Sequence, residues 1–286
     1  MVLFTYPNWE DVHNQEWVQY CQKGGIETVA IINDLLHPYG TSLEEEVNML
    51  NDYSYVMSHS ERMKSFLKES GVIRPVVNLS LFDYPINPDV GLAQIERWLE
   101  AGTEPKERNS IAYAGKVWHP LREWIFSEHL KDIPIHLYYD LTEEEQIKLQ
   151  RHNQWDNLHY GGNFWGVEIY DLLEGDYGLI WNGDDCGEGM FEWKKISISS
   201  KLDFCLAGGL PIIAKRGTID GDLIEQHHIG LTINHLSELE NAISAISHEE
   251  YMTYQANLAP LARRAVKGEN FREVLEQIAG ARLAKG

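Results

Sequence analysis

The chain has 286 residues and a formal net charge of −20, with 43% hydrophobic and 24% charged residues. This length suits one large or two ordinary domains, and the composition is that of a water-soluble globular protein with no run of ~20 apolar residues that could form a membrane helix. The negative charge argues against nucleic acid and anionic lipid as partners, because both carry the same sign of charge.

The N-terminal stretch MVLFTYPNWEDV contains acidic residues and no basic region. It therefore does not read as a secretory signal or a transit peptide, and we expect a cytoplasmic protein. Three cysteines, Cys21, Cys186 and Cys205, lie far apart without CxxC spacing. We expect neither a disulfide framework nor a structural zinc site.

Short runs typical of β-strands alternate with helical patterns along the chain. The strand-like runs cover residues 2–6, 28–34, 55–58, 72–77, 110–115, 133–139, 178–183, 211–215 and 230–234. Capping boxes at Ser42–Glu45 and Thr142–Glu145 mark two helix starts, and helical patterns at 249–264 and 271–284 close the chain. The alternation predicts an α/β protein with parallel sheets and helices on both faces.

The strand pattern pauses between residues 80 and 109, where proline, asparagine and charged residues accumulate. We therefore predict a Rossmann-like domain over 1–105, a second over 106–250, and C-terminal helices over 251–286 that cross back to the first domain. Two doubly wound domains that face each other enclose a cleft, and ligands of such sheets bind at the carboxyl ends of the strands.

The segment KLDFCLAGGLPIIAK (201–215) reads as a short helix followed by a buried strand. Ser199 or Ser200 would cap the helix, and Gly208 and Gly209 would end it. Lys201 then stands at the positive end of the helix dipole, which is unfavourable for a cation unless an anion lies nearby. A bound diphosphate would supply that anion; a lysine extended into water is the alternative.

The order of elements around this segment resembles the C-terminal domain of GT-B glycosyltransferases. Further stretches narrow the resemblance to bacterial sugar transferases of the β-1,6-galactofuranosyltransferase and glycoprotein glucosyltransferase type. They are FTYPNW (4–9), AIINDLLHP (30–38), VMSHSERMKSFLKESGV (56–72), LSLFDYP (79–85), IAYAGK (111–116), LHYGGNF (158–164), YGLIWNG (177–183) and SKLDFCLAGGLPII (200–213).

The resemblance implies a GT-B fold, with an acceptor-side domain over 1–105 and a nucleotide-sugar-binding domain over 106–250. It also implies transfer of a hexosyl group from a nucleotide sugar, UDP-linked, to a hydroxyl of a glycan or glycoprotein acceptor. The relatives begin with an additional βα segment ahead of FTYPNW, so the resemblance further implies that the N-terminal domain is truncated in this sequence.

The resemblance pairs Lys201 with the diphosphate of the donor. Ser199, Ser200 and the backbone of Ala207, Gly208 and Gly209 would then cradle phosphate or ribose oxygens. The family's first loop of the second domain reads A-G-N with a basic residue a few positions on. Here it reads AGKVWHPLREW after a strand, which places Gly115 at the cleft and leaves the basic role to Lys116, His119 or Arg122.

Two further residues are candidates for contact with the nucleoside. The ring of Tyr160 would stack on uracil or hydrogen-bond the ribose, and Glu225 would accept from ribose hydroxyls. Each has an equally ordinary structural reading, since Tyr160 suits a core and Glu225 suits a solvated helix face.

Glycosyl transfer with inversion requires a base within hydrogen-bond reach of the acceptor hydroxyl. Asp34 at the end of a predicted strand and His37 three residues later are the candidates, and capping of the next loop is the alternative for Asp34. Retaining enzymes of another GT-B group, the large glycogen-synthase-like class, carry a glutamate seven residues before the proline of their small-Gly-x-Pro turn, where this chain has Phe204. This absence favours inversion. Tyr6 and Trp9 are candidate platforms for the acceptor sugar.

The loop WNGDDCGEGMFEW (181–193) gathers acidic residues, but no histidine or further aspartate gives it the spacing of a metal site. We expect no metal and no cofactor besides the UDP-sugar substrate. Two other functions stay open: a non-catalytic GT-B-like glycan-binding or accessory protein, and a nucleotide-sugar epimerase. A homo-oligomer is also open.

Overall fold

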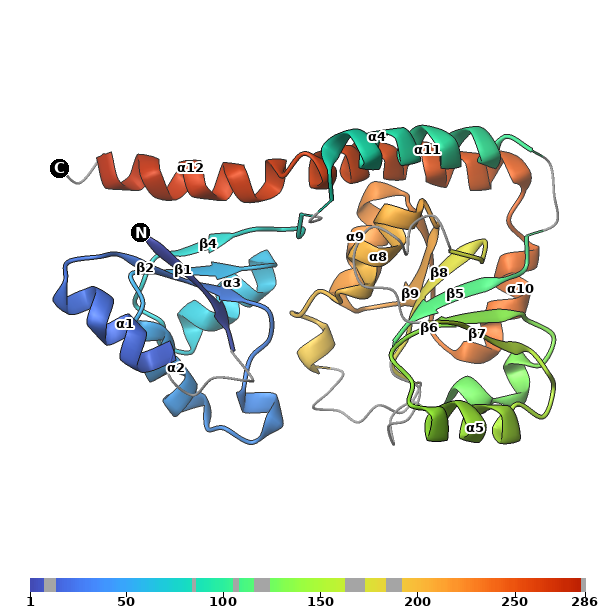
Figure 1. Cartoon of the computed structure of the whole chain (residues 1–286), viewed down its shortest axis with the longest axis horizontal. Helices are drawn as coiled ribbons and strands as arrows, with labels where there is room; N and C mark the ends of the chain where they lie inside the picture. Colours follow the sequence, from blue (N-terminus) through green and yellow to red (C-terminus); the bar gives the residue numbers. More distant parts are fainter. Residues whose placement is uncertain are drawn as a thin grey trace. The chain divides into compact units, whose positions relative to one another are not determined.

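The computed structural model describes residues 1–7, 14–83, 86–104, 108–115, 124–162, 173–183 and 192–283. Its contacts divide the chain into two compact units (Figure 1). Unit 1 comprises Met1–Phe82, Glu188–Ile198 and Gly268–Gly286, and unit 2 comprises Asp83–Gly187 and Ser199–Lys267. The segment between residues 83 and 105, which we assigned from the sequence to the first domain, thus groups with unit 2.

Unit 1 is built on a four-stranded parallel sheet in the order β1-β2-β3-β4. The strands are β1 (Val2–Tyr6), β2 (Thr28–Ile32), β3 (Tyr55–Ser58) and β4 (Val76–Asn78). The helices are α1 (Asn14–Lys23), η1 (His37–Tyr39), α2 (Leu43–Asn51), α3 (Glu61–Glu69) and α12 (Glu269–Leu283).

Both faces of this sheet are buried, which explains the continuous apolar run of β2. Val29 on one face packs with Val274 and Ile278 of α12. Ala30 and Ile32 on the other face join the cluster formed by α1, α2 and α3. Successive side chains of a strand alternate between faces, so one short run serves two cores. Figure 1 shows α12 and the group α1 to α3 on opposite sides of the sheet.

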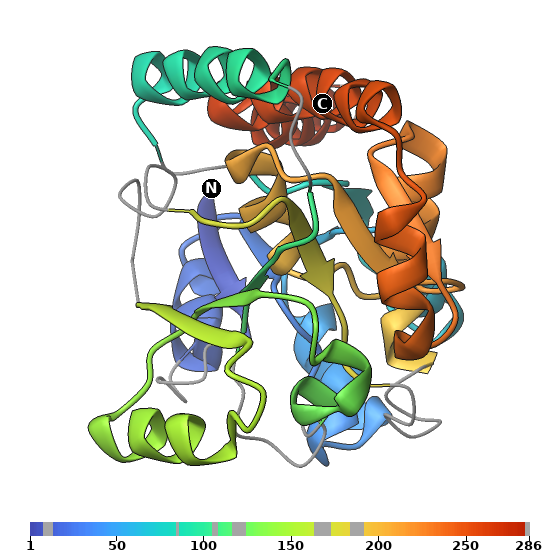
Figure 2. The same cartoon turned by 90° about the vertical axis from the view of Figure 1, so that its right-hand side faces the viewer.

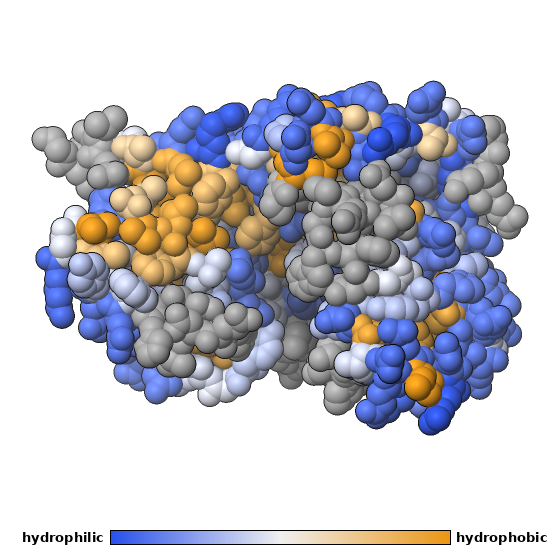
Figure 3. Space-filling view, in the orientation of Figure 1, coloured by the Kyte–Doolittle hydropathy of each residue, from blue (hydrophilic) through white to orange (hydrophobic). Residues whose placement is uncertain are grey.

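β1 is an edge strand, paired with β2 alone in the described sheet. Met1, Val2 and Leu3 at its start are exposed by 47%, 36% and 39%. In Figure 3 this part of unit 1 shows a group of apolar side chains at the surface.

Unit 2 is built on a six-stranded parallel sheet in the order β10-β9-β8-β5-β6-β7. The strands are β5 (Ile111–Ala114), β6 (Ile135–Tyr138), β7 (Leu158–Gly162), β8 (Tyr177–Ile180), β9 (Ile212–Lys215) and β10 (Gly230–Ile233). Its helices are α4 (Pro88–Gly102), η3 (Glu128–Leu130), α5 (Glu143–His152), α8 (Lys201–Gly208), α9 (Ile219–His227), η4 (Leu236–Glu238), α10 (Leu239–Ser244) and α11 (His248–Val266).

The chain builds this second sheet outward from its middle. After β5 it adds β6 and β7 on one side, then returns to add β8, β9 and β10 on the other. Helices α4 and α11 lie side by side, as Figure 2 also shows, and both contact α8. This doubly wound order confirms the predicted α/β class, and its reversal between β5 and β8 is the topological switch point at which ligands of such folds bind.

The local predictions hold at most elements. Each of the nine strand-like runs overlaps a strand of the structure, and both capping boxes are present, with Ser42 bonded to Glu45 and Thr142 to Glu145. The strand β7 has no counterpart among the predicted runs because its sequence, LHYGG, is short and rich in glycine. Among the described residues, no helix combines the length and apolar character needed to cross a bilayer.

The capping box of α5 gives a direct test of local stability. Thr142 accepts from the Glu145 N–H, and the Glu145 carboxylate accepts from the Thr142 N–H at 2.9 Å. Thr142→Ala removes the cap and should lower the free energy of unfolding by about 1 kcal/mol, measured by urea denaturation. Thr142→Ser keeps the hydroxyl and should stay close to the wild type; an equal loss in both variants would contradict the capping role.

Candidate functional site

The carboxyl ends of β5 and β8 form the topological switch point of the second sheet. β5 ends at Ala114 and β8 at Ile180, and the two strands pair directly. Crossovers leave this point in opposite directions, and in doubly wound folds ligands bind at such a switch point. The residues that follow the two strands are therefore the first candidates for a site.

Lys201 and Gly115 meet at this point. A Cβ on Gly115 would lie 2.7 Å from Cε of Lys201 and 2.9 Å from the ring of Tyr113. The Lys201 ammonium lies 5.7 Å from the centre of that ring. Gly115 thus leaves room for the lysine stem, and the aromatic face stabilises the cation at the strand end. The sequence named both residues, and the structure brings them together.

The start of α8 is held by hydrogen bonds of Ser199. Its N–H donates to Oδ1 of the buried Asp220 at 2.9 Å, and its Oγ accepts from the Lys201 N–H at 3.4 Å. Ser200 is exposed and makes no side-chain cap. In the first turn, burial raises the pKa of Asp203 well above its ordinary value, and Asp220 and Asp83 raise it further. Three carboxyl groups of the chain, those of Asp203, Asp220 and Asp83, thus lie near this helix start.

A second lysine at the same edge was not singled out from the sequence. Lys215 is the last residue of β9; its ammonium lies 5.6 Å from the centre of the Trp181 ring and donates to the Gly183 carbonyl at 3.5 Å. The sequence feature that could have identified Lys215 is its place as a basic residue at the carboxyl end of a predicted buried strand, PIIAK. Lys215 and Lys201 are both cations held over aromatic faces at the ligand end of the sheet.

Ala207, Gly208 and Gly209 lie at the other end of α8. Gly209 has φ of 65° and ends the helix, and a Cβ there would lie 2.2 Å from the Trp98 ring of α4. Its carbonyl accepts from Nε2 of Gln255 in α11 at 3.0 Å. These contacts give Gly209 a packing role, and the three residues lie before the amino end of β9, at the opposite end of α8 from Lys201.

The remaining donor-side candidates are scattered. The Tyr160 hydroxyl donates to the Tyr139 carbonyl at 3.1 Å, and Glu225 is 53% exposed, pairing with Arg216 at 3.6 Å and accepting from the Thr232 hydroxyl. These contacts join Tyr160 and Glu225 to neighbours other than Lys201. The candidates Lys116, His119, Arg122 and Trp9 lie outside the described residues.

In unit 1, both candidate bases follow β2. Both oxygens of Asp34 are engaged: Oδ1 accepts from the Leu35 N–H at 2.9 Å and Oδ2 from the Tyr39 hydroxyl at 2.8 Å. Burial raises the pKa of Asp34. His37 is bonded through Nδ1 to Glu46, a buried acid that we did not single out from the sequence. The sequence feature that could have identified Glu46 is a glutamate at a core-facing position of a predicted amphipathic helix.

Tyr6 is buried, at 5% exposure, and its hydroxyl donates to Oε1 of Glu46 at 3.3 Å. Burial and the neighbouring Glu46 raise its pKa above the usual range of tyrosine. The ring packs edge-on against Tyr53. Its contribution to an acceptor site would therefore act through Glu46 and not through an open ring face.

The segment 192–198 is anchored to the carboxyl end of β3. The Ser60 hydroxyl donates to the Ile196 carbonyl at 2.6 Å, and Nδ1 of His59 accepts from the Ile198 N–H at 3.3 Å. Arg62 donates to the Lys195 carbonyl at 3.3 Å. The ligand end of the first sheet thus holds the stretch of chain that leads directly into Ser199 and Lys201.

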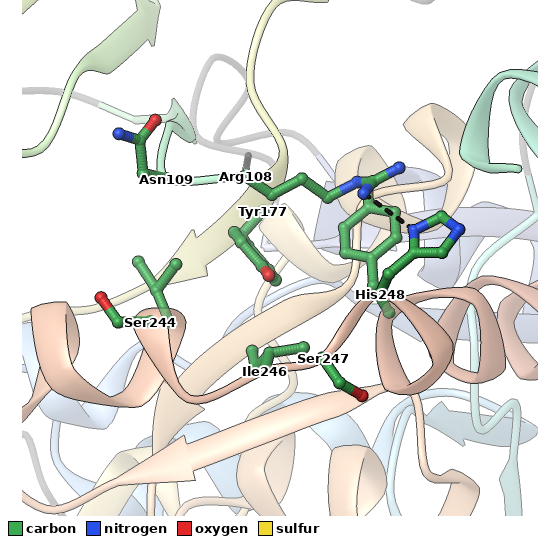
Figure 4. A pocket seen from close by; sticks show the side chains of 9 residues that line it. Arg108, Asn109, Tyr177, Ser244, Ile246, Ser247 and His248 are labelled. Atoms are coloured by element: carbon green, nitrogen blue, oxygen red, sulfur yellow. Dashed lines mark hydrogen bonds between the residues drawn. The ribbon is translucent and has the colours of Figure 1, made fainter. Parts of the chain in front are cut away.

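A separate cavity of about 230 Å³ lies at the opposite end of the second sheet (Figure 4). Arg108 donates to Nδ1 of His248 at 3.2 Å and to the Gly102 carbonyl at 3.0 Å, and its guanidinium lies 4.1 Å from the centre of the Tyr251 ring. Because Arg108 precedes β5, this cavity lies at the amino ends of the strands, where we assign it a structural role in joining α4 to α11.

Within the described part of the chain, no three His, Cys, Asp or Glu side chains group as a metal site. Glu192 is bound by Lys195 at 2.5 Å. The acidic residues Asp184, Asp185 and Glu188 of the same loop lie outside the described ranges.

Comparison with known proteins identifies the family. Residues 111–278 match the family described as glucosyltransferase 3-like, C-terminal domain, and residues 1–81 match its N-terminal domain. The chain belongs to the glucosyltransferase 3-like family. The matched ranges include both sheets, so the assignment covers each unit.

Curated relatives of this glucosyltransferase 3-like chain carry the names of glycosyltransferases. It is 22% identical over 255 residues to the β-1,6-galactofuranosyltransferase WbbI of Escherichia coli K12, covering 87% of this chain and 70% of the relative. It is 24% identical over 260 residues to glucosyltransferase 3 of Streptococcus gordonii, covering 88% and 70%.

Solved structures of GT-B glycosyltransferases share the fold. The Anabaena protein Alr3699/HepE superimposes with a TM-score of 0.63 at 14% identity, covering 93% of this chain and 76% of HepE. WaaG, a glycosyltransferase of lipopolysaccharide biosynthesis, gives 0.54 at 12% identity, covering 91% and 83%. These likenesses confirm the GT-B fold expected from the sequence.

The anchor at His59 predicts a pH dependence of stability. Burial, together with a smaller effect of Lys194, lowers the pKa of this histidine to about 4 from its ordinary 6.5. Between these two values the unfolded chain binds a proton that the folded protein does not, so stability is lost as pH falls from about 6.5 to about 4. The loss attributable to His59 is on the order of 3 kcal/mol.

The measurement is urea unfolding of wild type and His59→Gln from pH 7 to pH 4. The variant cannot take up this proton, so its stability should fall less steeply over that window. His129→Gln replaces an exposed histidine and serves as the control. Parallel curves for wild type and His59→Gln would contradict the assignment.

Proposed function

We propose that this chain transfers a hexosyl group from a UDP-sugar to a hydroxyl of a glycan or glycoprotein acceptor. The observation that carries the proposal is the meeting of Lys201 with Gly115 at the switch point of the second sheet. HepE, which shares this fold, has been solved with UDP and with UDP-glucose. The relatives named as galactofuranosyltransferase and glucosyltransferase point to the same chemistry.

The donor's diphosphate is the group for which Lys201 is suited. As C1–O cleaves, negative charge develops on the leaving diphosphate, and a fixed cation lowers the energy of that state. Lys215 at the end of β9 carries a second cation at the same edge. In a protein of net charge −20, such a local concentration of cations is needed to hold an anionic donor.

The acceptor hydroxyl must lose its proton during transfer, and unit 1 carries the two candidate bases. In Asp34 both carboxylate oxygens already accept local hydrogen bonds, whereas His37 has one ring nitrogen engaged by Glu46. We favour His37 for this reason. Inversion at the anomeric carbon remains the prediction from Phe204, whose ring lies 5.8 Å from that of Tyr138.

The other two functions considered from the sequence are not favoured. The curated relatives are named as transferases, and the fold neighbours include several glycosyltransferases. Release of UDP only when an acceptor is present would support transfer. Interconversion of free UDP-sugars would support an epimerase, and donor binding without turnover would support an accessory protein.

Lys201→Ala tests the donor site. A charge-assisted contact is worth about 1.5–3 kcal/mol, so the variant should bind UDP roughly 10- to 100-fold more weakly by calorimetry. Lys148→Ala serves as the control, since Lys148 pairs with Glu144 on the surface of α5. Unchanged UDP affinity in Lys201→Ala would remove this residue from the site.

Gly115→Ala tests the same geometry without changing charge. The added methyl would lie 2.7 Å from Cε of Lys201, so the lysine must move. The charge-assisted contact between its ammonium and the diphosphate is then weakened, and UDP affinity should fall about tenfold or more. Gly280→Ala, at a helical position with open space around the new methyl, is the matched control. Equal UDP affinity in both variants would show that the lysine stem does not need this glycine.

A further inference from the structure

Glu46 is a buried acid whose carboxylate organises the turn after β2. It is 1% exposed. Oε1 accepts from the Leu36 N–H at 2.5 Å and from the Tyr6 hydroxyl at 3.3 Å. Oε2 accepts from the His37 N–H at 3.1 Å and bonds Nδ1 of His37 at 2.6 Å. Four donors thus converge on one acceptor, which compensates for the cost of burying it.

This arrangement fixes the tautomer of His37. Because Glu46 accepts at both oxygens, Nδ1 of His37 is the donor, and the neutral ring is left with Nε2 as its acceptor. The ring plane is fixed as well. It stacks on Phe66 with 5.4 Å between centres and a 26° angle, and meets Trp193 edge-on at 5.9 Å.

His37 lines a cavity of about 520 Å³ that lies wholly within unit 1. Pro38, Phe66, Trp193 and Ile196 supply an apolar lining, and Glu192 and Lys195 add charge. The volume falls in the range of small-ligand sites, which combine apolar walls with a few fixed polar groups. The cavity is lined by the turn after β2 and by the segment 192–196, which is bonded to Ser60 beyond the end of β3. It therefore lies at the carboxyl ends of the strands, where ligands of such sheets bind.

A sugar ring matches this lining better than a purely apolar or an anionic ligand. Its C–H face packs on aromatic side chains, and its hydroxyls donate to a fixed acceptor. An apolar ligand would leave Nε2 of His37 without a hydrogen-bond donor, at the cost of burying it. An anion would face Glu192, and the nearby Lys195 is already paired with that acid.

We infer that this cavity is a carbohydrate subsite for the acceptor, in which Glu46 is a positioning residue that presents Nε2 of His37 to a sugar hydroxyl. The inference rests on the proposed glycosyl transfer. It assigns Glu46 a role through His37 and not through contact with the sugar. Phe66 and Trp193 define the face against which the ring packs.

The experiment uses the full chain saturated with UDP and two probes, methyl β-D-glucopyranoside and methyl β-D-galactopyranoside. Saturation-transfer NMR on the probe protons measures binding up to ~100 mM, where even a site worth little more than 1 kcal/mol is substantially filled. Wild type should bind at least one probe, with saturation strongest on its C–H face. Absence of binding for both probes overturns the inference.

Glu46→Gln tests the positioning role. A glutamine places an NH₂ group where two of the four donors point, so His37 loses its fixed orientation and probe affinity should fall at least tenfold. Glu44→Gln is the matched control, an exposed acid in the first turn of the same helix. Equal probe affinity in Glu46→Gln and wild type overturns the role of Glu46.

His37→Phe keeps a ring between Phe66 and Trp193 but removes Nε2, and should also weaken probe binding at least tenfold. In ¹⁵N long-range correlation spectra, the imidazole signals of the wild type that disappear in His37→Phe are those of His37. These should show a protonated Nδ1 and a bare Nε2, and a protonated Nε2 in the neutral ring overturns the inference. Thermal melting confirms that each variant is folded.

The outcome is separable from that of the proposed function. UDP stabilisation of the protein reports on unit 2, where Lys201 lies, and should be the same in wild type, Glu46→Gln and His37→Phe. Retained UDP stabilisation without probe binding overturns the carbohydrate subsite alone. Loss of UDP stabilisation in the wild type overturns the proposed donor, whatever the probes show.

Discussion

The reversal of strand order between β5 and β8 is the constraint on which the proposed donor site depends. It opens the second sheet at the carboxyl ends of two neighbouring strands. The first residue beyond β5 is Gly115, and the stem of Lys201 runs so close to it that a methyl group would not fit. The cation is thus placed by backbone topology and by the absence of one side chain.

The two units stabilise their charged side chains in different ways. In unit 2, Lys201 and Lys215 lie over the rings of Tyr113 and Trp181. An aromatic face stabilises a cation while leaving its formal charge in place for an anionic ligand. In unit 1, by contrast, the carboxylate of Glu46 accepts four hydrogen bonds from the protein, and these fix the turn that contains His37.

The segment 192–198 connects these two chemistries along the chain. Trp193 and Ile196 line the cavity beside His37, and Ile196 and Ile198 are bonded to Ser60 and His59. The next residues in sequence are Ser199 and the start of α8. One short stretch therefore supplies side chains to the proposed acceptor subsite and leads into the lysine proposed to bind the donor.

The sequence by itself determined the α/β class, the nine strand-like runs, both capping boxes and the start and end of α8, because these follow from side-chain period, caps and glycine positions within a few residues of each other. It also named Lys201 and Gly115. Only the tertiary structure decided that the two touch, that Gly209 packs on Trp98, and that Glu46 bonds His37. Residues far apart in the chain are brought together by sheet order and helix packing, and local patterns carry no information on which of them will meet.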